Sequence, residues 1–168
     1  MMHKYIFITI IFFLISCEPD DICSNATQTT PRLIIEFYNI ENSNELKTVP
    51  ALFAVGLDAD SNEINITNEI VSSRDRIELP LNGSVNSLRF KLYKNYDLID
   101  GVTSGNFDII NINYLTEIEF VSRSCGFMNN YIIEELAIEI DSDPWMNAVT
   151  ISSYEVKNEN ITHVQIFH

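Results

Sequence analysis

Apolar and polar residues alternate along several short stretches of the chain. In residues 88–93 every second residue is Leu or Phe, and the residues between them are Arg, Lys and Tyr; residues 77–81 follow a similar pattern. Because successive side chains of a strand point to opposite faces of a sheet, this pattern predicts strands with one buried face. Further strands are expected at residues 33–40, 51–57, 63–66, 107–114, 116–122, 148–156 and 161–167.

Turn residues separate these stretches. Asn82-Gly83 and Asp100-Gly101 favour the positive φ angles of tight reversals, and Asp143-Pro144 interrupts any ladder of strand hydrogen bonds. Short strands at this spacing predict an all-β fold, namely a single antiparallel β-sandwich of the immunoglobulin type or a similar one.

Residues 130–140 fit two patterns. Ile132, Leu136 and Ile140 fall at helical spacing, whereas Leu136, Ile138 and Ile140 also alternate with polar or small residues. Both a helix and a strand remain open from the sequence. We favour a strand, because the neighbouring segments are all strands and no helix cap is evident.

The first 16 residues have the features of a signal peptide. A short positive start with Lys4 precedes an 11-residue, largely apolar run at residues 5–15, which is shorter than the roughly 20 residues that span a bilayer. The four residues Leu14-Ile15-Ser16-Cys17 resemble the lipobox of bacterial lipoproteins, in which diacylglycerol is attached to the Cys thiol before cleavage. Cys17 is therefore the predicted lipidated first residue of the mature chain, and several acyl chains give stable anchoring.

The mature chain divides into a tether and a domain. Residues 18–31 are polar and contain two prolines, so residues 17–31 are expected to form a lipidated acidic tether. Residues 32–168 then form the β-sandwich domain. The 152 residues left after removal of residues 1–16 match the usual size of one domain.

The charge of the mature chain limits the classes of partner that it can bind. It carries 9 basic and 24 acidic residues, which gives a formal charge of −15. Such a surface repels phosphate backbones, so nucleic-acid binding is excluded as a function class. The charge fits a domain that a lipid holds at a membrane.

The remaining cysteines form an even pair. Once Cys17 carries lipid, Cys23 and Cys125 are left in an exported protein, where disulfides form. We expect them to bond, which closes a loop of about 100 residues and contributes up to about 4–5 kcal/mol in the chain-entropy model. Two unpaired buried thiols are the alternative. A metal site is disfavoured because neither Cys has a neighbouring Cys or His partner.

Signatures of catalysis are absent from the sequence. It has no Gly-x-Ser-x-Gly elbow, no His-Glu-x-x-His and no glycine-rich phosphate loop. His163 and His168 lie on the last predicted strand, where a histidine is usually structural. We therefore expect that the protein is not an enzyme and binds no cofactor. A hydrolase that uses a pair of carboxylates remains an alternative function. The composition neither supports nor excludes it, because any two of the 24 acidic residues could meet in the fold.

The best metal candidate is weak. Asp58, Asp60, Asn62 and Glu69 stand at positions 1, 3, 5 and 12 of a calcium-like loop, but Glu63 occupies position 6, where the sharp turn needs Gly. A hairpin turn rich in Asp and Asn is the alternative that we favour, and the segment 141–143 is a weaker case of the same kind.

Aromatic residues offer a candidate ligand platform. Trp145 follows Pro144 in a predicted loop and could stack on a sugar. The alternative is that it folds back over an edge of the sandwich. Six tyrosines could join such a platform, namely Tyr38, Tyr93, Tyr96, Tyr114, Tyr131 and Tyr154.

Motifs spread over nearly the whole mature chain are specific when taken together. They are Asp20-Asp21-Ile22-Cys23, Thr30-Pro31-Arg32-Leu33-Ile34-Ile35-Glu36-Phe37-Tyr38, Leu79-Pro80-Leu81, Val121-Ser122-Arg123-Ser124-Cys125-Gly126-Phe127 and His163-Val164-Gln165-Ile166-Phe167-His168. With them the chain resembles a family of short envelope lipoproteins of Bacteroidota whose domain has no known function. The resemblance implies a β-rich domain, agrees with a structural bridge between Cys23 and Cys125, and supplies no activity.

The resemblance also implies a location and a type of partner. Such proteins tend to accompany outer-membrane β-barrels, so we expect a non-enzymatic accessory protein anchored to the outer membrane through Cys17. The acidic residues Glu18, Asp20 and Asp21 loosely resemble a signal for export to the outer face, although Pro19 interrupts the run. A surface-facing and a periplasm-facing position both remain open. A surface carbohydrate- or peptide-binding module is the first alternative function.

Overall fold

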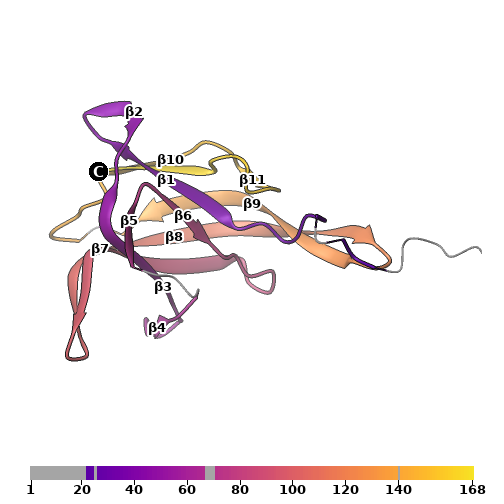
Figure 1. Cartoon of the computed structure of the whole chain (residues 1–168), viewed down its shortest axis with the longest axis horizontal. Coiled ribbons are helices and arrows are strands. Elements are labelled where there is room, and N and C mark those ends of the chain that lie inside the picture. Colours follow the sequence, from indigo (N-terminus) through magenta and orange to yellow (C-terminus); the bar gives the residue numbers. More distant parts are fainter. Residues whose placement is uncertain (1–21, 25, 67–70, 140) are drawn as a thin grey trace, which may run out of the picture. The chain divides into compact units, whose positions relative to one another are not determined.

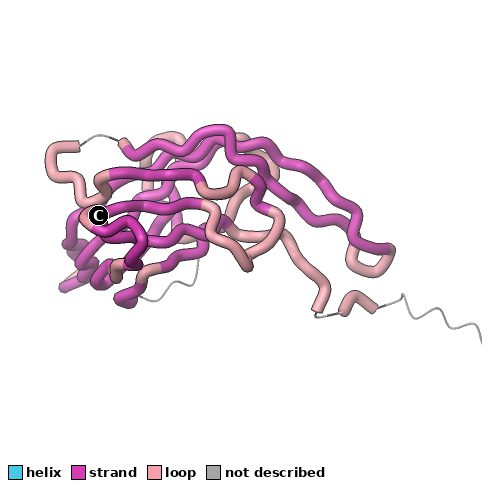
Figure 2. Tube along the Cα trace, turned by 90° about the horizontal axis from the view of Figure 1, so that it is seen from above, coloured by secondary structure: helices cyan, strands magenta, loops and turns pink. Residues whose placement is uncertain are grey.

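A computed structural model describes residues 22–24, 26–66, 71–139 and 141–168. These residues form strands and loops and contain no helix, so none of them belongs to a helix long and apolar enough to cross a membrane (Figure 2). The predicted all-β class is confirmed. The predicted signal peptide, the lipidation site Cys17 and the acidic tether residues Glu18, Asp20 and Asp21 lie outside the described residues, as does Glu69.

The strands of the described residues form two sheets (Figure 1). The first sheet has the order β10-β12-β1-β2, with β6 also paired to β1: β10 (Ala148–Ile151), β12 (Val164–Phe167), β1 (Leu33–Asn39), β2 (Asn42–Leu46) and β6 (Arg76–Leu79). The second sheet has the order β11-β9-β8-β7-β3-β4, with β5 also paired to β3: β11 (Glu155–Val156), β9 (Gly126–Ile138), β8 (Val102–Ser122), β7 (Ser87–Ile99), β3 (Val49–Leu57), β4 (Glu63–Ile64) and β5 (Ser72–Arg74).

The chain falls into two compact units. A small unit combines the described residues 22–24 and 26–27 with residues 120–127, which include the turn between β8 and β9. A large unit contains residues 28–119 and 128–168, and therefore all of the first sheet and most of the second. The two units are described separately below.

The large unit is a sandwich of the two sheets. Alternate residues of each strand face inward, as the period of a strand requires. The first sheet contributes residues such as Leu33, Ile35 and Phe37 of β1, and the second contributes Phe90 and Leu92 of β7. All five are at most 1 % exposed. The apolar residues of the alternating pattern at residues 88–93 thus lie on the inward face of β7.

One strand pair runs in a direction that the sequence pattern does not predict. β12 lies parallel to β1, with Ile35 opposite Val164 and Phe37 opposite Ile166. β6 pairs antiparallel with residues 33–36 of β1, so β1 has partners on both edges. The first sheet therefore depends on contacts between segments about 130 residues apart.

Several strand boundaries differ from the predicted ones. The predicted strands 107–114 and 116–122 are one long strand, β8, and the predicted strand 148–156 is divided into β10 and β11. The ambiguous segment is a strand as far as Ile138, which confirms the favoured reading. β2 was not predicted, because its sequence Asn-Ser-Asn-Glu-Leu is exposed throughout and has no buried face.

The hairpin of β7 and β8 ends in a separate arm, residues 95–106. Its register shifts between Lys94 and Asp97, and Asn95 has a φ of 56°. Gly105 lies opposite with a φ of 115°, and a Cβ there would come within 2.8 Å of the Asn95 carbonyl oxygen. The close approach requires glycine. Figure 1 shows the arm turning away from the neighbouring strands.

Candidate functional site

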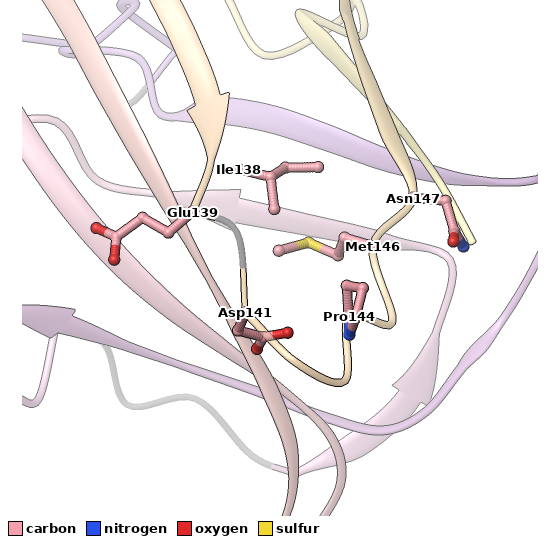
Figure 3. A pocket seen from close by; sticks show the side chains of 6 residues that line it. All are labelled: Ile138, Glu139, Asp141, Pro144, Met146 and Asn147. Atoms are coloured by element: carbon pink, nitrogen blue, oxygen red, sulfur yellow. The ribbon is translucent and has the colours of Figure 1, made fainter.

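A cavity of about 250 Å³ lies in the large unit beside the loop that follows β9 (Figure 3). Apolar and acidic side chains surround it together. They are Ile138, Glu139, Asp141, Pro144, Met146 and Asn147. The cavity is small for a ligand pocket, which usually measures roughly 300–1,000 Å³. Its shape alone does not define a substrate.

The Glu139 carboxylate is already paired. Arg89 Nε and Nη2 each lie 2.9 Å from Glu139 Oε1. The Glu139 backbone N–H donates to the Ile109 carbonyl, at 2.8 Å, which continues the contact between the end of β9 and β8. Glu139 therefore holds the rim of the cavity in place.

Beneath the same loop lies a buried acid, Asp108. Its side chain is 0 % exposed, and its Oδ2 accepts hydrogen bonds from the backbone N–H groups of Met146 (2.6 Å) and Trp145 (3.0 Å). Burial raises the pKa of Asp108, and the charge of Asp141 raises it further, whereas the two N–H donors lower it. The carboxyl group thus fixes the course of residues 145 and 146 at the cavity wall.

Replacement of Asp108 separates its two roles. Asp108→Ala leaves two backbone donors without an acceptor and is expected to cost about 1–3 kcal/mol of unfolding free energy. Asp108→Asn keeps an acceptor oxygen and removes the titration. Because the pKa of Asp108 is raised in the folded state, wild type loses stability as the pH rises through that pKa, and the Asn variant does not.

Urea unfolding of the wild type and both variants, from about pH 4 to about pH 8, measures this difference. The stability of Asp108→Asn relative to wild type should increase with pH, while Asp108→Ala should be the least stable form. Equal stability of Asp108→Ala and Asp108→Asn at every pH would contradict the proposed backbone role.

A second group of charged residues lies on the outer face of the second sheet. The Lys91 ammonium is 2.7 Å from Glu63 Oε1 and 3.9 Å from the centre of the Phe107 ring. The Tyr93 hydroxyl donates to the same Glu63 oxygen, at 2.5 Å. These contacts attach β4 to β7 and satisfy the carboxylate, so the group is structural.

Trp145, the predicted stacking residue, belongs to the core. Its side chain is 5 % exposed, and its ring centre lies 5.9 Å from that of Phe37 and 5.7 Å from that of His168. Its Nε1–H donates to the Leu92 carbonyl, at 3.3 Å. The ring therefore presents no open face to a ligand, and it fills the sandwich edge as the alternative reading describes.

Tyr93 and Tyr96 form a cluster of rings with Phe53, in which the Tyr96 and Phe53 ring centres are 4.3 Å apart, whereas two other tyrosines belong to the core. Tyr114 and Tyr131 are buried with their ring centres 5.4 Å apart. Their hydroxyls donate to the carbonyls of Asn82 and Leu81, at 2.8 and 3.1 Å, and so hold the turn before β7. Tyr154 is 57 % exposed.

The calcium-like segment forms a capped turn. Asp58 Oδ1 accepts the backbone N–H groups of Asp60 (2.9 Å) and Asn62 (2.7 Å), and its Oδ2 accepts the Asn62 side-chain amide at 2.9 Å. The hydrogen bond from the Asn62 side chain is the main cause that lowers the pKa of Asp58. Among the described residues no group of three or more His, Cys, Asp or Glu is placed to hold a metal. Between β3 and β4 the segment is the hairpin turn that the sequence favoured.

Both histidines of the last predicted strand are buried. His163 Nδ1 accepts the Ile34 backbone N–H at 2.9 Å, and His168 Nε2 lies 3.2 Å from the Lys47 carbonyl oxygen. Burial is the main cause that lowers the pKa of each imidazole, which favours the neutral form. They connect segments of the first sheet.

The small unit contains the predicted cysteine pair. Cys23 and Cys125 are joined, with their Sγ atoms 1.98 Å apart. The Ser122 hydroxyl accepts the Cys125 backbone N–H at 3.0 Å and so closes the turn between β8 and β9. This turn and the segment after residue 21 are therefore connected covalently.

Two features of interest were missed in the sequence. Asp108 stands at an inward position of a strand pattern whose other inward members are apolar, and a lone acid at such a position is a recognisable signal. The arm also has a signal, because Leu98, Ile99 and Val102 lie on either side of the predicted turn at Asp100-Gly101. An apolar turn of this kind has no core to enter.

Comparison with known protein families gives a match. The model of a family of unknown function, DUF6452, matches residues 51–168. The matched region begins in β3 and includes the arm, the cavity and the turn between β8 and β9. No curated protein and no solved structure is similar enough to count as a match.

Proposed function

Since the chain belongs to the DUF6452 family of unknown function, we propose a function from its own features: it is a lipid-anchored envelope protein that binds or supports an outer-membrane protein. The lipid on Cys17 holds it at the membrane, and a surface of the β-domain contacts the partner. The finer assignment, a lipoprotein of Bacteroidota, rests on the sequence resemblance.

The arm is the observation that carries this proposal. Leu98, Ile99 and Val102 are 55 %, 62 % and 68 % exposed, respectively. Strand pairing within the arm puts Ile99 opposite Val102 and Leu98 opposite Thr103, so apolar side chains occupy both faces. Exposed apolar groups that are clustered in this way typically mark contact sites with another protein.

The sequence before the domain supports the anchor. Cys17 stands at the end of an apolar leader and directly after a small residue, as a lipobox requires. The mature chain is strongly acidic, so attraction to anionic headgroups cannot hold it at a membrane. A covalent lipid supplies the attachment that the charge does not.

Photocrosslinking in intact cells tests the partner. A photoreactive phenylalanine analogue at Ile99 is expected to capture one outer-membrane protein in stoichiometric yield. The same analogue at Leu46, an exposed residue of β2 (46 % exposed), is the matched control and should capture none. Cys17→Ala should release the protein from the membrane fraction and abolish the product at Ile99.

Two results would contradict the proposal. Identical crosslinked products at positions 99 and 46 would show that the arm is not a specific contact surface. Retention of the Cys17→Ala protein in the membrane fraction would contradict the proposed lipid anchor, because no lipid can be attached at residue 17 of this variant.

The alternative functions have less support. A carbohydrate-binding module needs an exposed aromatic platform, and Trp145 is buried. A hydrolase needs carboxylates that converge in a cleft without other partners. Asp108 accepts two backbone hydrogen bonds, and Glu139 pairs with Arg89. These acids are therefore engaged in the fold.

A further inference from the structure

The small unit exposes apolar side chains at the turn between β8 and β9. Phe120 is 57 % exposed and Phe127 is 70 % exposed, and their rings contact each other with centres 5.3 Å apart. Ile22 of the same unit is 84 % exposed. Among the residues of the small unit that the structure describes, none belongs to the hydrophobic core. We call the residues 120–127 the hairpin end.

The charge of the hairpin end differs from that of the whole chain. The chain has 24 acidic and 10 basic residues. Among the described residues of the small unit, Arg123 is the one charged residue and no acid is present. Arg123 is exposed between Ser122 and Ser124 in the turn. The hairpin end is therefore apolar and weakly cationic in an otherwise acidic protein.

The disulfide connects the hairpin end to the predicted anchor. Cys23 is bonded to Cys125, and Cys17 precedes Cys23 by six residues. Six residues span at most about 20 Å when fully extended. If Cys17 carries lipid, as the proposed function requires, Cys23 is thus held within about 20 Å of the lipidated residue, and Cys125 of the hairpin end lies only 4.8 Å (Cα–Cα) from Cys23.

We propose that the hairpin end, together with Ile22, is a membrane contact. Phe120, Phe127 and Ile22 enter the interface of the bilayer that holds the lipid, and Arg123 pairs with headgroup phosphates. Aromatic side chains favour the headgroup level, and an Arg can keep its charge there while its stem is buried. The acidic residues Glu18, Asp20 and Asp21 lie next to the lipid in sequence and repel anionic headgroups. The contact therefore favours a zwitterionic surface.

Tryptophan fluorescence in vesicles tests this contact. The full-length lipoprotein carrying Phe127→Trp is purified from membranes and reconstituted into phosphatidylcholine vesicles with brominated acyl chains, which quench nearby tryptophans. The matched control is Tyr154→Trp, at a residue of the large unit that is 57 % exposed. The native Trp145 is buried, and its signal is subtracted by using the wild type.

The expected result is strong quenching and a blue shift for Phe127→Trp, with neither for Tyr154→Trp. Equal fluorescence of the two variants in a protein that sediments with the vesicles overturns the membrane contact but leaves the anchor intact. A protein that fails to sediment and carries no acyl chains in its mass spectrum overturns the proposed anchor, and the contact with it.

A second variant tests the role of the disulfide. Adding Cys23→Ser and Cys125→Ser to Phe127→Trp leaves Cys17 and its lipid unchanged but frees the tether from the hairpin end. The protein should still sediment with the vesicles, and the quenching at position 127 should decrease. Unchanged quenching would show that the hairpin end contacts the bilayer without the disulfide, which overturns the stated role of the covalent connection.

Discussion

Replacing Cys23 and Cys125 together by serine is expected to lower the free energy of unfolding by up to about 4–5 kcal/mol. The two residues are 102 positions apart, so their bond removes a large number of conformations from the unfolded chain. Both cysteines belong to the small unit, so removing their bond deletes no contact of the large unit. The loss should therefore come mainly from the unfolded state.

Urea unfolding of a Cys17→Ser background, with and without the two further serines, measures the effect. Omitting the third thiol prevents exchange with the pair under study. Wild-type cysteines treated with a reductant serve as the control, and they should unfold at the same urea concentration as the double serine variant. A midpoint that neither reduction nor substitution changes would show that the bond contributes nothing to stability.

Trp145→Ala is expected to cost about 3–5 kcal/mol, the range for removing a large buried aromatic side chain. The ring packs against Phe37 and His168, and its N–H satisfies the Leu92 carbonyl. Tyr154→Ala at an exposed site is the control and should change stability by no more than about 0.5 kcal/mol.

Circular dichroism in the far ultraviolet follows unfolding of both variants without needing the tryptophan signal. Trp145→Phe gives an intermediate case, because it keeps most of the packing and loses one hydrogen bond. If Trp145→Ala were as stable as Tyr154→Ala, the conclusion that the Trp145 ring is buried would be wrong. Stacking of Trp145 on a ligand would then again be a valid interpretation.

The sequence predicted the strands with a buried face better than those without one. The pattern at residues 88–93 identified β7, because alternation reports directly which side chains the sandwich buries. β2 has no such pattern, since all five of its residues are exposed and only backbone hydrogen bonds to β1 define it. A strand of this kind has no signal in its side chains.

The candidate sites divide in the same way. The bond between Cys23 and Cys125 followed from cysteine count and the predicted compartment, neither of which needs the fold. The burial of Trp145 could not be predicted, because it depends on Phe37 and His168, which lie more than a hundred and more than twenty residues away, respectively, in the sequence. Long-range contacts also decide that Asp108 serves the backbone of the loop above it.

The parallel pairing of β1 with β12 has a consequence for the order of events during synthesis. β6 can join one edge of β1 once residue 79 has been made, but the other edge has no partner until residues 164–167 follow. At about 5–20 residues per second, that edge stays open for several seconds. An open strand edge can pair with any other chain nearby. Until β12 has been made, this edge of β1 is therefore a place where the incomplete chain can pair with another chain.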